Sequence, residues 1–327
     1  MTTRGDEPDQ EHERNRVGYD ALYKRALGTA RGLAQFLQAF DPATADLLRL
    51  DTIEPRGTEL FDVLPEWYRR IADIVARVEA RAAERELLTL HVEVQRSRKR
   101  SLGRRMLDYY TLLRRSEDLT VLPYAVLLYR DEPALGYKTY EETFRGRTIA
   151  TLTYFQVSLP ALDARTYAAG DNALGRALAS AMRLPRAERA RQEVYRAAIA
   201  AILGALGGKA MDEDAALALW SLVHTYLPYQ IEQRDEIGVQ WSEEEETMVQ
   251  QLDRRWIAEI EARGEARGEA RGALRAKRSW LKEDIAGRFD ALPPEVAARI
   301  DGIEREDELD AIRGRLDAVV SPDQLFA

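Results

Sequence analysis

The sequence predicts a mixed α/β domain that is followed by a mostly helical region. Three observations indicate this fold class. Several segments before residue 160 carry apolar side chains at every second position, which is the spacing of a strand. Between them lies a segment with the spacing of an amphipathic helix, and after Pro160 only the helical spacing recurs. With 327 residues, of which 45% are apolar, the chain can bury the cores of two compact domains.

The chain begins with a charged, polar segment, residues 1–17, that is expected to be disordered. Residues 19–40 then carry apolar side chains at helical spacing, and Asp41 and Pro42 mark the end of that predicted helix. A second, less regular segment leads from there to Trp67.

Two strand-like runs follow, at residues 71–79 and 87–94, and the charged stretch between them suits a hairpin connection. In the second run, apolar residues alternate with Thr89, His91, Glu93 and Gln95. Because strand side chains alternate with a period of two, these polar residues share one face. Each strand is therefore expected to have one apolar face and one polar face.

A helix and two more strands complete the first domain. Leu102, Met106, Tyr109 and Leu113 recur at the spacing of an amphipathic helix, and Tyr109 is expected in the core. Residues 120–129 and 148–159 follow as strands. The first of these is so continuously apolar that it is expected near the centre of the sheet. The predicted order is helix, strand, strand, helix, strand, strand.

The rest of the chain is predicted to be helical. Helical runs lie at residues 197–206, 215–227 and 243–289, and two short ones follow Pro293 and Pro294. These runs suggest a helical region at residues 161–255, a charged helical linker at 256–278 and a small helical domain at 279–327. His224 lies in an apolar helical run and is expected to be packed there.

Composition excludes several kinds of site. The chain has no cysteine and three widely separated histidines, which rules out thiolate zinc sites, iron–sulfur clusters, disulfides and cysteine nucleophiles. Any metal is expected to be a hard, oxygen-bound cation such as Mg²⁺. The N-terminus lacks the apolar core of a signal peptide, and no apolar run approaches the roughly 20 residues that span a bilayer. A cytoplasmic protein of bacterial type, without membrane contact, is expected.

Positive charge is concentrated in one segment, although the formal net charge is −8. Residues 94–115 contain eight basic residues and one acid, a local charge of +7. Such a cluster can hold a phosphate backbone through charge and counterion release, which predicts DNA as a partner. The alternative is an ordinary solvated helix face. The candidate DNA-binding residues are Arg96, Arg98, Lys99, Arg100, Arg104 and Arg105.

Asp73 and Glu93 lie on the polar faces of adjacent predicted strands. A hairpin in suitable register would bring the two carboxylates within reach of one divalent cation, with Gln95 projecting beside Glu93. A magnesium ion held there can lower the pKa of a water molecule and stabilise the charge that develops on a phosphodiester. The alternative is that these residues form the solvent face of an antiparallel hairpin.

At these residues the chain resembles a known family. The segments "YDALYKRAL", "IADIVARV", "LLTLHVEVQRS" and "GRRMLDYYTLL" are similar, in order and spacing, to the recombination-promoting nuclease and transposase-like family, a branch of the PD-(D/E)XK nucleases. The resemblance implies a nuclease domain of restriction-endonuclease-like fold at residues 18–160. It further implies a DNA endonuclease that depends on Mg²⁺ or Mn²⁺ and that is linked to recombination or transposition.

Carried onto this sequence, the resemblance implies a role for each motif residue. Asp73 and Glu93 bind the metal, and the backbone carbonyl of Val94 completes the site. Gln95 takes the position of the usual catalytic lysine. Asp20, on the first helix, either supplies a further acid or is a surface or capping residue.

Two positions depart from the family pattern. Ala72 stands where proline is usual, which is a small change. Gln95 lacks the charge with which a lysine orients the attacking water, so the site would be slower or would rely on Arg96 or a second metal. This leaves a second hypothesis, a catalytically weak, nuclease-derived DNA-binding or scaffold protein. His91, on the face of Glu93, is either a proton-transfer group or a structural residue.

A Gly-Glu-Ala-Arg repeat runs from Glu261 to Gly272. On a helix its glutamates and its arginines each recur at i and i+4, and each like-charged pair is destabilising by about 0.2–0.5 kcal/mol. An antiparallel partner helix would offset that repulsion, so self-association is one hypothesis and a loose helical linker is the other. The terminal "LPPEVAARIDGIEREDELDAIRGRL" resembles a small helical domain of unknown function that is often attached to nuclease-like proteins.

Overall fold

The computed structural model describes residues 19–56, 73–81, 86–98, 102–227, 229 and 241–326. Outside these residues lie the predictions for residues 1–17, Trp67, Ala72, Lys99 and Arg100, and the side chain of Asp20 is not described either. The chain divides into two units, with the boundary between Asp253 and Arg254. Each unit is described by itself.

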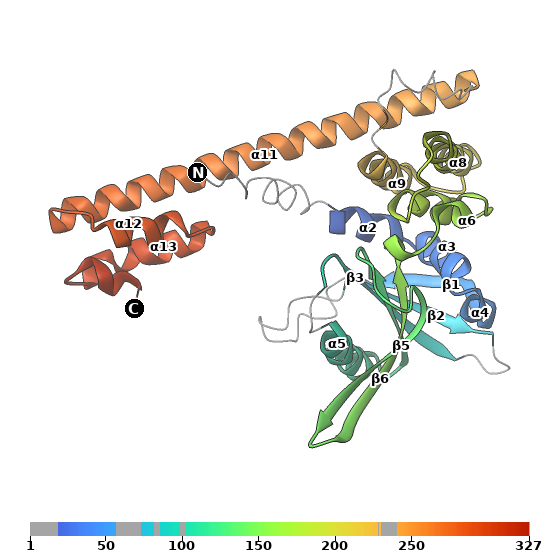
Figure 1. Cartoon of the computed structure of the whole chain (residues 1–327), viewed down its shortest axis with the longest axis horizontal. Coiled ribbons are helices and arrows are strands. Elements are labelled where there is room, and N and C mark those ends of the chain that lie inside the picture. Colours follow the sequence, from blue (N-terminus) through green and yellow to red (C-terminus); the bar gives the residue numbers. More distant parts are fainter. Residues whose placement is uncertain are drawn as a thin grey trace. The chain divides into compact units, whose positions relative to one another are not determined.

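The first unit contains a six-stranded mixed sheet flanked by helices, which confirms the predicted α/β class (Figure 1). The strand order is β1-β2-β3-β4-β6-β5. Neighbours pair antiparallel from β1 to β3, parallel from β3 through β4 to β6, and antiparallel between β6 and β5. The strands are β1 (Leu48–Arg56), β2 (Ile74–Ala80), β3 (Leu87–Gln95), β4 (Thr120–Leu127), β5 (Leu135–Phe144) and β6 (Arg147–Ser158). The expected central place of β4 is confirmed.

The N-terminal helical segment is broken in two, so the prediction of a single helix over residues 19–40 is wrong. The helices are α2 (Tyr19–Leu27) and α3 (Ala30–Phe40). The Thr29 hydroxyl accepts a hydrogen bond from the Gly32 N–H at 2.9 Å and so caps the start of α3. A Cβ on Gly32 would lie 2.1 Å from the carbonyl oxygen of Ala26, so the close approach of the two turns requires glycine there.

Two strands were not predicted, β1 and β5, and both lie at the edges of the sheet. The irregular segment after residue 40 contains α4 (Pro42–Leu47), which begins at the Asp41 cap, and then β1. An edge strand has one neighbouring strand, so fewer of its side chains are buried. Of the ten residues of β5, seven are exposed, three are half-buried and none is buried. Such strands lack the apolar run that reveals β4.

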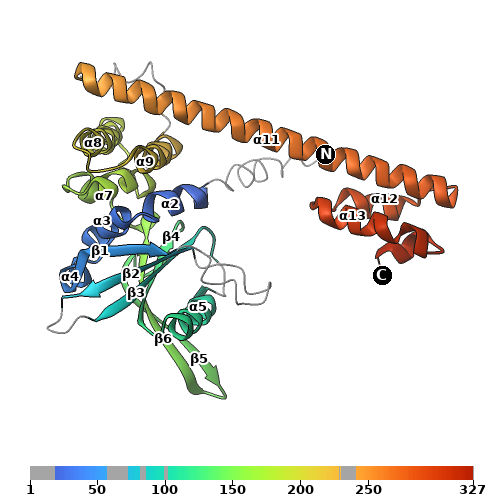
Figure 2. The same ribbon diagram turned by 180° about the vertical axis from the view of Figure 1, so that it is seen from behind.

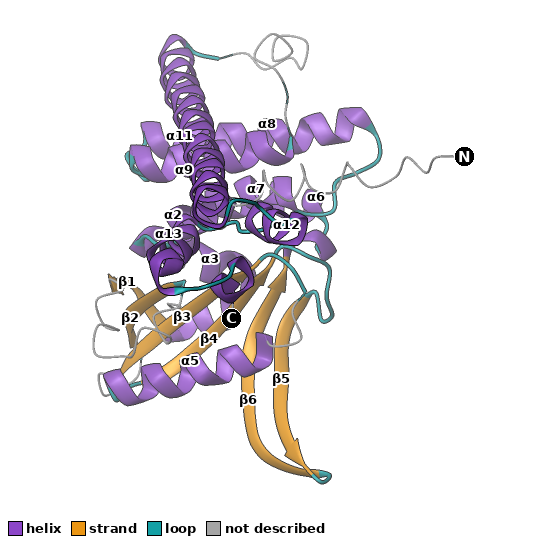
Figure 3. Ribbon diagram, turned by 90° about the vertical axis from the view of Figure 1, so that its left-hand side faces the viewer, coloured by secondary structure: helices purple, strands orange, loops and turns teal. Residues whose placement is uncertain are grey.

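The polar face of β3 is buried, which contradicts the alternative that it is the solvent face of a hairpin. Every residue from Leu88 to Gln95 is buried. The cause is α5 (Leu102–Glu117), which lies across this face of the sheet (Figure 3). The predicted apolar stripe of α5 is confirmed for Leu102, Met106 and Leu113, which are buried. The reading of these polar residues as the solvent face of a hairpin is therefore wrong.

A group of helices packs with α2 and α3 in the first unit (Figure 2). The hydroxyls of Tyr23 and Tyr226 lie 3.1 Å apart and join α2 to α9. His224 is buried, as expected, with its ring nitrogens 3.1 Å from the Tyr195 hydroxyl and 2.9 Å from the Trp220 carbonyl. The elements are η4 (Leu159–Ala161), α6 (Ala164–Ala168), α7 (Ala173–Leu178), η5 (Ala179–Ala181), α8 (Glu188–Gly207) and α9 (Glu213–Tyr226).

The second unit is helical. The long helix α11 (Glu243–Phe289) begins in the first unit and ends in the second, and it includes the whole charged segment 256–278. The two short helices expected after Pro293 and Pro294 are confirmed, and they pack with the end of α11 around Leu281, Ile285 and Ile300. The elements after α11 are α12 (Pro294–Asp301), α13 (Glu306–Arg315), η6 (Leu316–Ala318) and η7 (Pro322–Phe326). Within the described parts of the chain, no helix is both long and apolar enough to cross a membrane.

Candidate active site

The two predicted metal-binding carboxylates meet where β2 begins. Asp73 immediately precedes β2, whose first residue, Ile74, pairs with Val92 of β3. The Val94 N–H donates a hydrogen bond to Asp73 Oδ2 at 2.8 Å. This bond holds the Asp73 carboxylate against the part of β3 that carries Glu93.

Each carboxylate is paired with a cation from a different helix. Lys24 Nζ of α2 lies 2.7 Å from Asp73 Oδ1, and Arg105 Nη2 of α5 lies 2.9 Å from Glu93 Oε1. The carboxylate side chains are 9% and 5% exposed, whereas those of the cations are 40% and 32% exposed. Ionised groups removed from water need such partners, because an isolated buried charge costs several kcal/mol or more. The two cations therefore stabilise two neighbouring ionised carboxylates.

Gln95 connects the same arginine to the end of β3. Its Oε1 accepts a hydrogen bond from Arg105 Nη2, and its Nε2 donates to the Ser97 carbonyl at 2.6 Å. One guanidinium group thus contacts both Glu93 and Gln95, which suits its five donors in a fixed planar fork. Where the family resemblance expects a lysine, this chain has an amide that holds an arginine.

Tyr109 of α5 was predicted in the core, and it is half-buried against the core cluster of Val75, Leu113 and Val121. It also lies beside the charges of the site. The pKa of its hydroxyl is raised to about 12, first by burial and then by the Glu93 carboxylate. Arg105 and Lys24 oppose this effect and Asp73 adds to it, so the hydroxyl is close enough to sense all four charges. Tyr109 is half-buried and neutral at neutral pH. Helical spacing alone could not separate this position from the fully buried ones.

His91 lies two residues before Glu93, on the same face of β3, and is completely buried. Its ring meets the Tyr109 ring edge-on, with the centroids 5.3 Å apart. Among the residues that the structure describes, neither ring nitrogen has a hydrogen-bond partner. Burial lowers the pKa of the imidazole to about 3, so the ring is neutral at neutral pH. These features favour a structural role over proton transfer.

The donor set fits one hard divalent cation. Asp73 and Glu93 offer carboxylate oxygens, the ligands that Mg²⁺ prefers, and water usually fills several of its other positions. The backbone of Val94 is fixed beside the Asp73 carboxylate by its N–H bond. In the described ranges of the chain, no three carboxylate, histidine or cysteine side chains form a larger group for a metal. Among the described side chains the set is therefore limited to two carboxylates, and the candidate Asp20 lies outside them.

The predicted DNA-binding arginines differ in exposure and in what they contact. Arg98 and Arg104 are exposed, and Arg96 is half-buried. Arg105, which was grouped with them as a phosphate contact, is instead turned toward Glu93 and so belongs to the site itself. Its neighbour Arg104 points away because adjacent residues of a helix lie on different sides.

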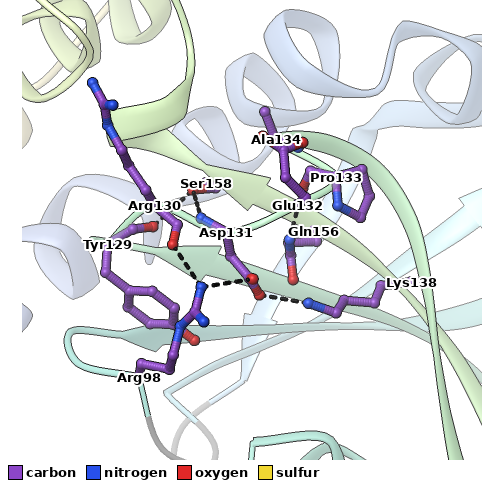
Figure 4. A network of polar contacts seen from close by, with 10 residues as sticks. All are labelled: Arg98, Tyr129, Arg130, Asp131, Glu132, Pro133, Ala134, Lys138, Gln156 and Ser158. Atoms are coloured by element: carbon purple, nitrogen blue, oxygen red, sulfur yellow. Dashed lines mark hydrogen bonds and ion pairs between the residues drawn. The ribbon is translucent and has the colours of Figure 1, made fainter.

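The loop after β4 adds residues that sequence reasoning missed (Figure 4). The Leu128 N–H donates to the Gln95 carbonyl at 2.9 Å and thereby ties this loop to the end of β3. Tyr129 follows, and its hydroxyl senses the charges of Asp131, Arg98 and Arg105, while burial is the main cause that raises its pKa. The loop therefore lies next to the candidate site.

Asp131 of this loop forms ion pairs with two cations, Arg98 and Lys138. Arg98 Nη2 donates to Asp131 Oδ1 at 3.1 Å, and Lys138 Nζ lies 2.5 Å from Asp131 Oδ2 (Figure 4). The guanidinium carbon of Arg98 also lies 6.0 Å from the centre of the Tyr129 ring. The sequence could have indicated these residues by their place directly after β4. The strands β3, β4 and β6 are parallel, and ligands bind outside the carboxyl ends of such strands.

Comparisons of this chain with family models, with curated proteins and with solved structures found no match. The family resemblance of the sequence therefore stays a prediction. The function has to be inferred from the contacts of the site.

Proposed function

We propose that this site hydrolyses phosphodiester bonds of DNA with Mg²⁺ or Mn²⁺. The observation that carries the proposal is the 2.8 Å hydrogen bond from the Val94 N–H to Asp73, which fixes one carboxylate beside the strand that bears Glu93. Two buried carboxylates on adjacent strands repel each other and lose hydration, so they oppose folding unless they are compensated. Charge arrangements of this kind are concentrated at functional sites.

The cation, when bound, would offset phosphate charge and lower the pKa of a water molecule. Asp73 and Glu93 would hold it through their carboxylate oxygens. Lys24 and Arg105 are partly exposed, so their charged groups can exchange a carboxylate for a phosphate oxygen. They would then stabilise the negative charge that grows on the phosphate during hydrolysis. In this proposal Lys24 and Arg105, rather than Arg96, supply the charge that Gln95 lacks.

DNA is the substrate that the neighbouring charges favour. Arg98 and Arg104 are exposed close to the end of β3, and Lys138 lies beside Arg98 through their shared contact with Asp131. Such cations neutralise successive phosphates of a nucleic-acid backbone. Roles in recombination or transposition follow from the sequence resemblance and are proposed with it. A cytoplasmic location stays the expectation drawn from the composition of the chain.

The direct test is nicking of supercoiled plasmid in Mg²⁺ by the full chain. We expect Asp73→Asn and Glu93→Gln each to abolish the nicking, because each removes one negative oxygen ligand without changing the shape of the side chain. Glu117→Gln is the matched control. Like Glu93, Glu117 is a glutamate whose side chain is almost fully buried, at 1% exposed, and is paired with an arginine, but it lies on α5 and its partner is Arg77 of β2. Nicking that survives in Asp73→Asn and Glu93→Gln, or that is absent from the natural chain in both Mg²⁺ and Mn²⁺, would contradict the proposal.

A second function is favoured by one observation, the contact of Gln95 and Glu93 with a single arginine. An amide in place of a lysine, with the carboxylates already paired, also suits a protein that holds DNA without cutting it. Binding of DNA by the natural chain, with no nicking in either metal, would support this DNA-binding or scaffold function. Absence of salt-sensitive DNA binding would contradict both functions, since phosphate contacts always weaken with salt.

A further inference from the structure

The hairpin of β5 and β6 extends beyond the rest of the sheet. The two strands pair from Leu135 opposite Val157 to Phe144 opposite Arg147, and their register shifts between Glu142 and Thr143, where Ile149 of β6 is skipped. Pairing of β6 with β4 begins only at Phe155, opposite Tyr124. Residues 147–154 of β6 are thus paired with β5 alone among the described strands, and Figure 3 shows this two-stranded arm continuing past α5.

The end of the arm is exposed, and it carries large apolar side chains and arginines that are not packed against the rest of the sheet. Every residue from Glu141 to Ile149 is exposed. Phe144 is 62% exposed and Ile149 is 64% exposed. Residues 143–149 contain two arginines and no acid. An isolated two-stranded hairpin is marginally stable in water, and the exposed Phe144 and Ile149 bury little apolar area that would stabilise this one.

The turn itself places an arginine where the backbone disfavours one. Arg145 has φ 48° and Gly146 has φ 76°, so both central residues of this two-residue turn have positive φ. Turns of this kind favour asparagine, aspartate or glycine. An ordinary L-residue in the left-handed region costs roughly 1–2 kcal/mol. The guanidinium carbon of Arg145 lies 5.4 Å from the centre of the Phe144 ring, so charge and aromatic surface are presented together.

The arm faces the same side of the sheet as the candidate active site. Tyr140 of β5 packs against the core cluster that contains Leu102 and Met106 of α5. Phe144 lies four residues further along β5, beyond the register shift, and Arg147 is its partner in the pairing. The same helix, α5, brings Arg105 to Glu93.

The spacing between the arm and the site suits double-helical DNA. Glu93 pairs with Ala125, which pairs with Gln156 of β6. From Gln156 back to Arg147 is nine residues, or about 30 Å at about 3.3 Å per residue. One turn of B-DNA is about 34–36 Å long, and its major groove is about 12 Å wide and admits a two-stranded ribbon.

We propose that residues 143–149 form a groove-binding tip that contacts double-stranded DNA about one helical turn from the bond at the candidate active site. This inference rests on the proposed function for the identity of the substrate. Arg145 and Arg147 would neutralise phosphates, and Phe144 would pack against the sugar and base edges. A second copy of the chain, whose Glu141 and Glu142 could meet Arg145 and Arg147, is the other occupant that the test distinguishes.

The test measures DNA affinity of the full chain carrying Glu93→Gln, so that the DNA stays intact. The tip variant adds Arg145→Asn and Arg147→Thr, which remove the charges while favouring the turn and the strand. The control variant instead adds Arg186→Ala and Arg189→Ala, two exposed arginines around the start of α8. Fluorescence anisotropy at several salt concentrations would use a 24-base-pair duplex and an 8-base-pair duplex.

For the tip variant we expect at least a roughly tenfold loss of affinity on the long duplex. We also expect the slope of log affinity against log salt to become shallower by about 1.8, the value for two phosphate contacts. The short duplex, which cannot reach both places, and the control variant should show neither change. Affinity and slope equal to the Glu93→Gln parent, or an equal loss on both duplexes, would overturn the proposal. So would unchanged affinity with a lower mass in light scattering, which would identify a second copy as the occupant.

Nicking by the chain with an intact Glu93 separates this inference from the proposed function. If the tip variant loses affinity for the long duplex while the natural chain nicks in neither metal, the groove-binding tip stands and the hydrolysis does not. If nicking depends on Asp73 and Glu93 while the tip variant binds like its parent, the hydrolysis stands and the tip is refuted.

Discussion

Lys24 and Asp73 form an ion pair that joins the first helix to the start of β2, with Nζ and Oδ1 2.7 Å apart. The lysine comes from an element that precedes the whole sheet in the chain, and the aspartate is 9% exposed. The family resemblance leads one to expect a catalytic lysine where this chain has Gln95. Lys24 supplies an ammonium group at the same site and can take over the charge-stabilising role of that lysine. Its contribution can be separated from that of the carboxylates.

We expect Lys24→Gln to lower the rate of Mg²⁺-dependent plasmid nicking by about 100-fold, the effect of removing one charge-stabilising donor. Lys24→Arg keeps the charge and should retain more of the rate. In EDTA, Lys24→Gln should also lower the free energy of unfolding by about 1–3 kcal/mol, because the buried Asp73 carboxylate loses its cation. Initial nicking rates and urea unfolding measure the two effects. Arg31→Gln, a change of an exposed cation on α3, should alter neither; equal rates in Lys24→Gln and the natural chain would refute the role.

Introducing the expected lysine at position 95 should increase neither the stability of the chain nor its nicking rate. In Gln95→Lys the new ammonium group would face Arg105, and the hydrogen bonds that Gln95 makes to Arg105 and to the Ser97 carbonyl would be lost. We expect a loss of about 1–3 kcal/mol in the free energy of unfolding and no gain in nicking. Arg105→Gln alone should also destabilise, because Glu93 is 5% exposed and loses its cation.

The double variant Gln95→Lys with Arg105→Gln decides whether the two positions act as a unit. Its new lysine can pair with Glu93, so it should be more stable than the sum of the single effects predicts, by about 0.5–3 kcal/mol. Urea unfolding of the four chains gives this coupling energy. Strict additivity would show that Gln95 and Arg105 do not depend on each other.

The elements that the sequence predicted correctly include β4 and α5, each of which has a clear apolar pattern. The segment of β4 is continuously apolar because β3 and β6 flank it, and α5 shows its apolar stripe because it lies on the sheet. The edge strands β1 and β5 were missed because they need no apolar run. The single helix predicted over residues 19–40 failed because the Thr29 cap and the contact at Gly32 are local signals that helical periodicity does not show.

The candidate site was predicted in part, for a similar reason. Period-two alternation placed Asp73 and Glu93 on adjacent strands, and in the structure Asp73 bonds to the residue after Glu93 while the Tyr109 hydroxyl senses both charges. Their cations were not predicted, since Lys24 and Arg105 come from helices whose position over the sheet is a tertiary feature. A charge run in a sequence also does not show which arginine turns inward.

The long helix α11 allows a test of the self-association hypothesis. Gly264 and Gly268 lie on it with open space around them, since a Cβ at either would meet no atom within 4 Å. We expect Gly264→Leu with Gly268→Leu to strengthen the helix of each chain while blocking the close approach of a partner helix. Light scattering should then report a smaller mass than that of the natural chain. Gly314→Leu on α13, also in open space, is the control; a natural chain that is already monomeric would favour the linker hypothesis.

The burial of His91 predicts a specific dependence of stability on pH. Its imidazole has a pKa of about 3 in the folded chain and about 6.5 when it is free in the unfolded chain. Below pH 6.5 the unfolded chain therefore binds a proton that the folded chain does not. The stabilisation is fully present above pH 6.5 and is lost as the pH falls toward 3, by about 1.4 kcal/mol per pH unit in the steep part.

His91→Phe isolates this effect, because phenylalanine keeps a ring that can meet Tyr109 edge-on but cannot bind a proton. In EDTA, the natural chain should lose roughly 1 kcal/mol more than His91→Phe in the free energy of unfolding between pH 7.5 and pH 5.5. Urea unfolding at the two pH values gives both losses, and taking their difference cancels the contributions of the other titrating groups. Equal losses in the two chains would mean that His91 takes up its proton as easily in the folded chain as in the unfolded one, and that water or another residue reaches the ring beneath α5.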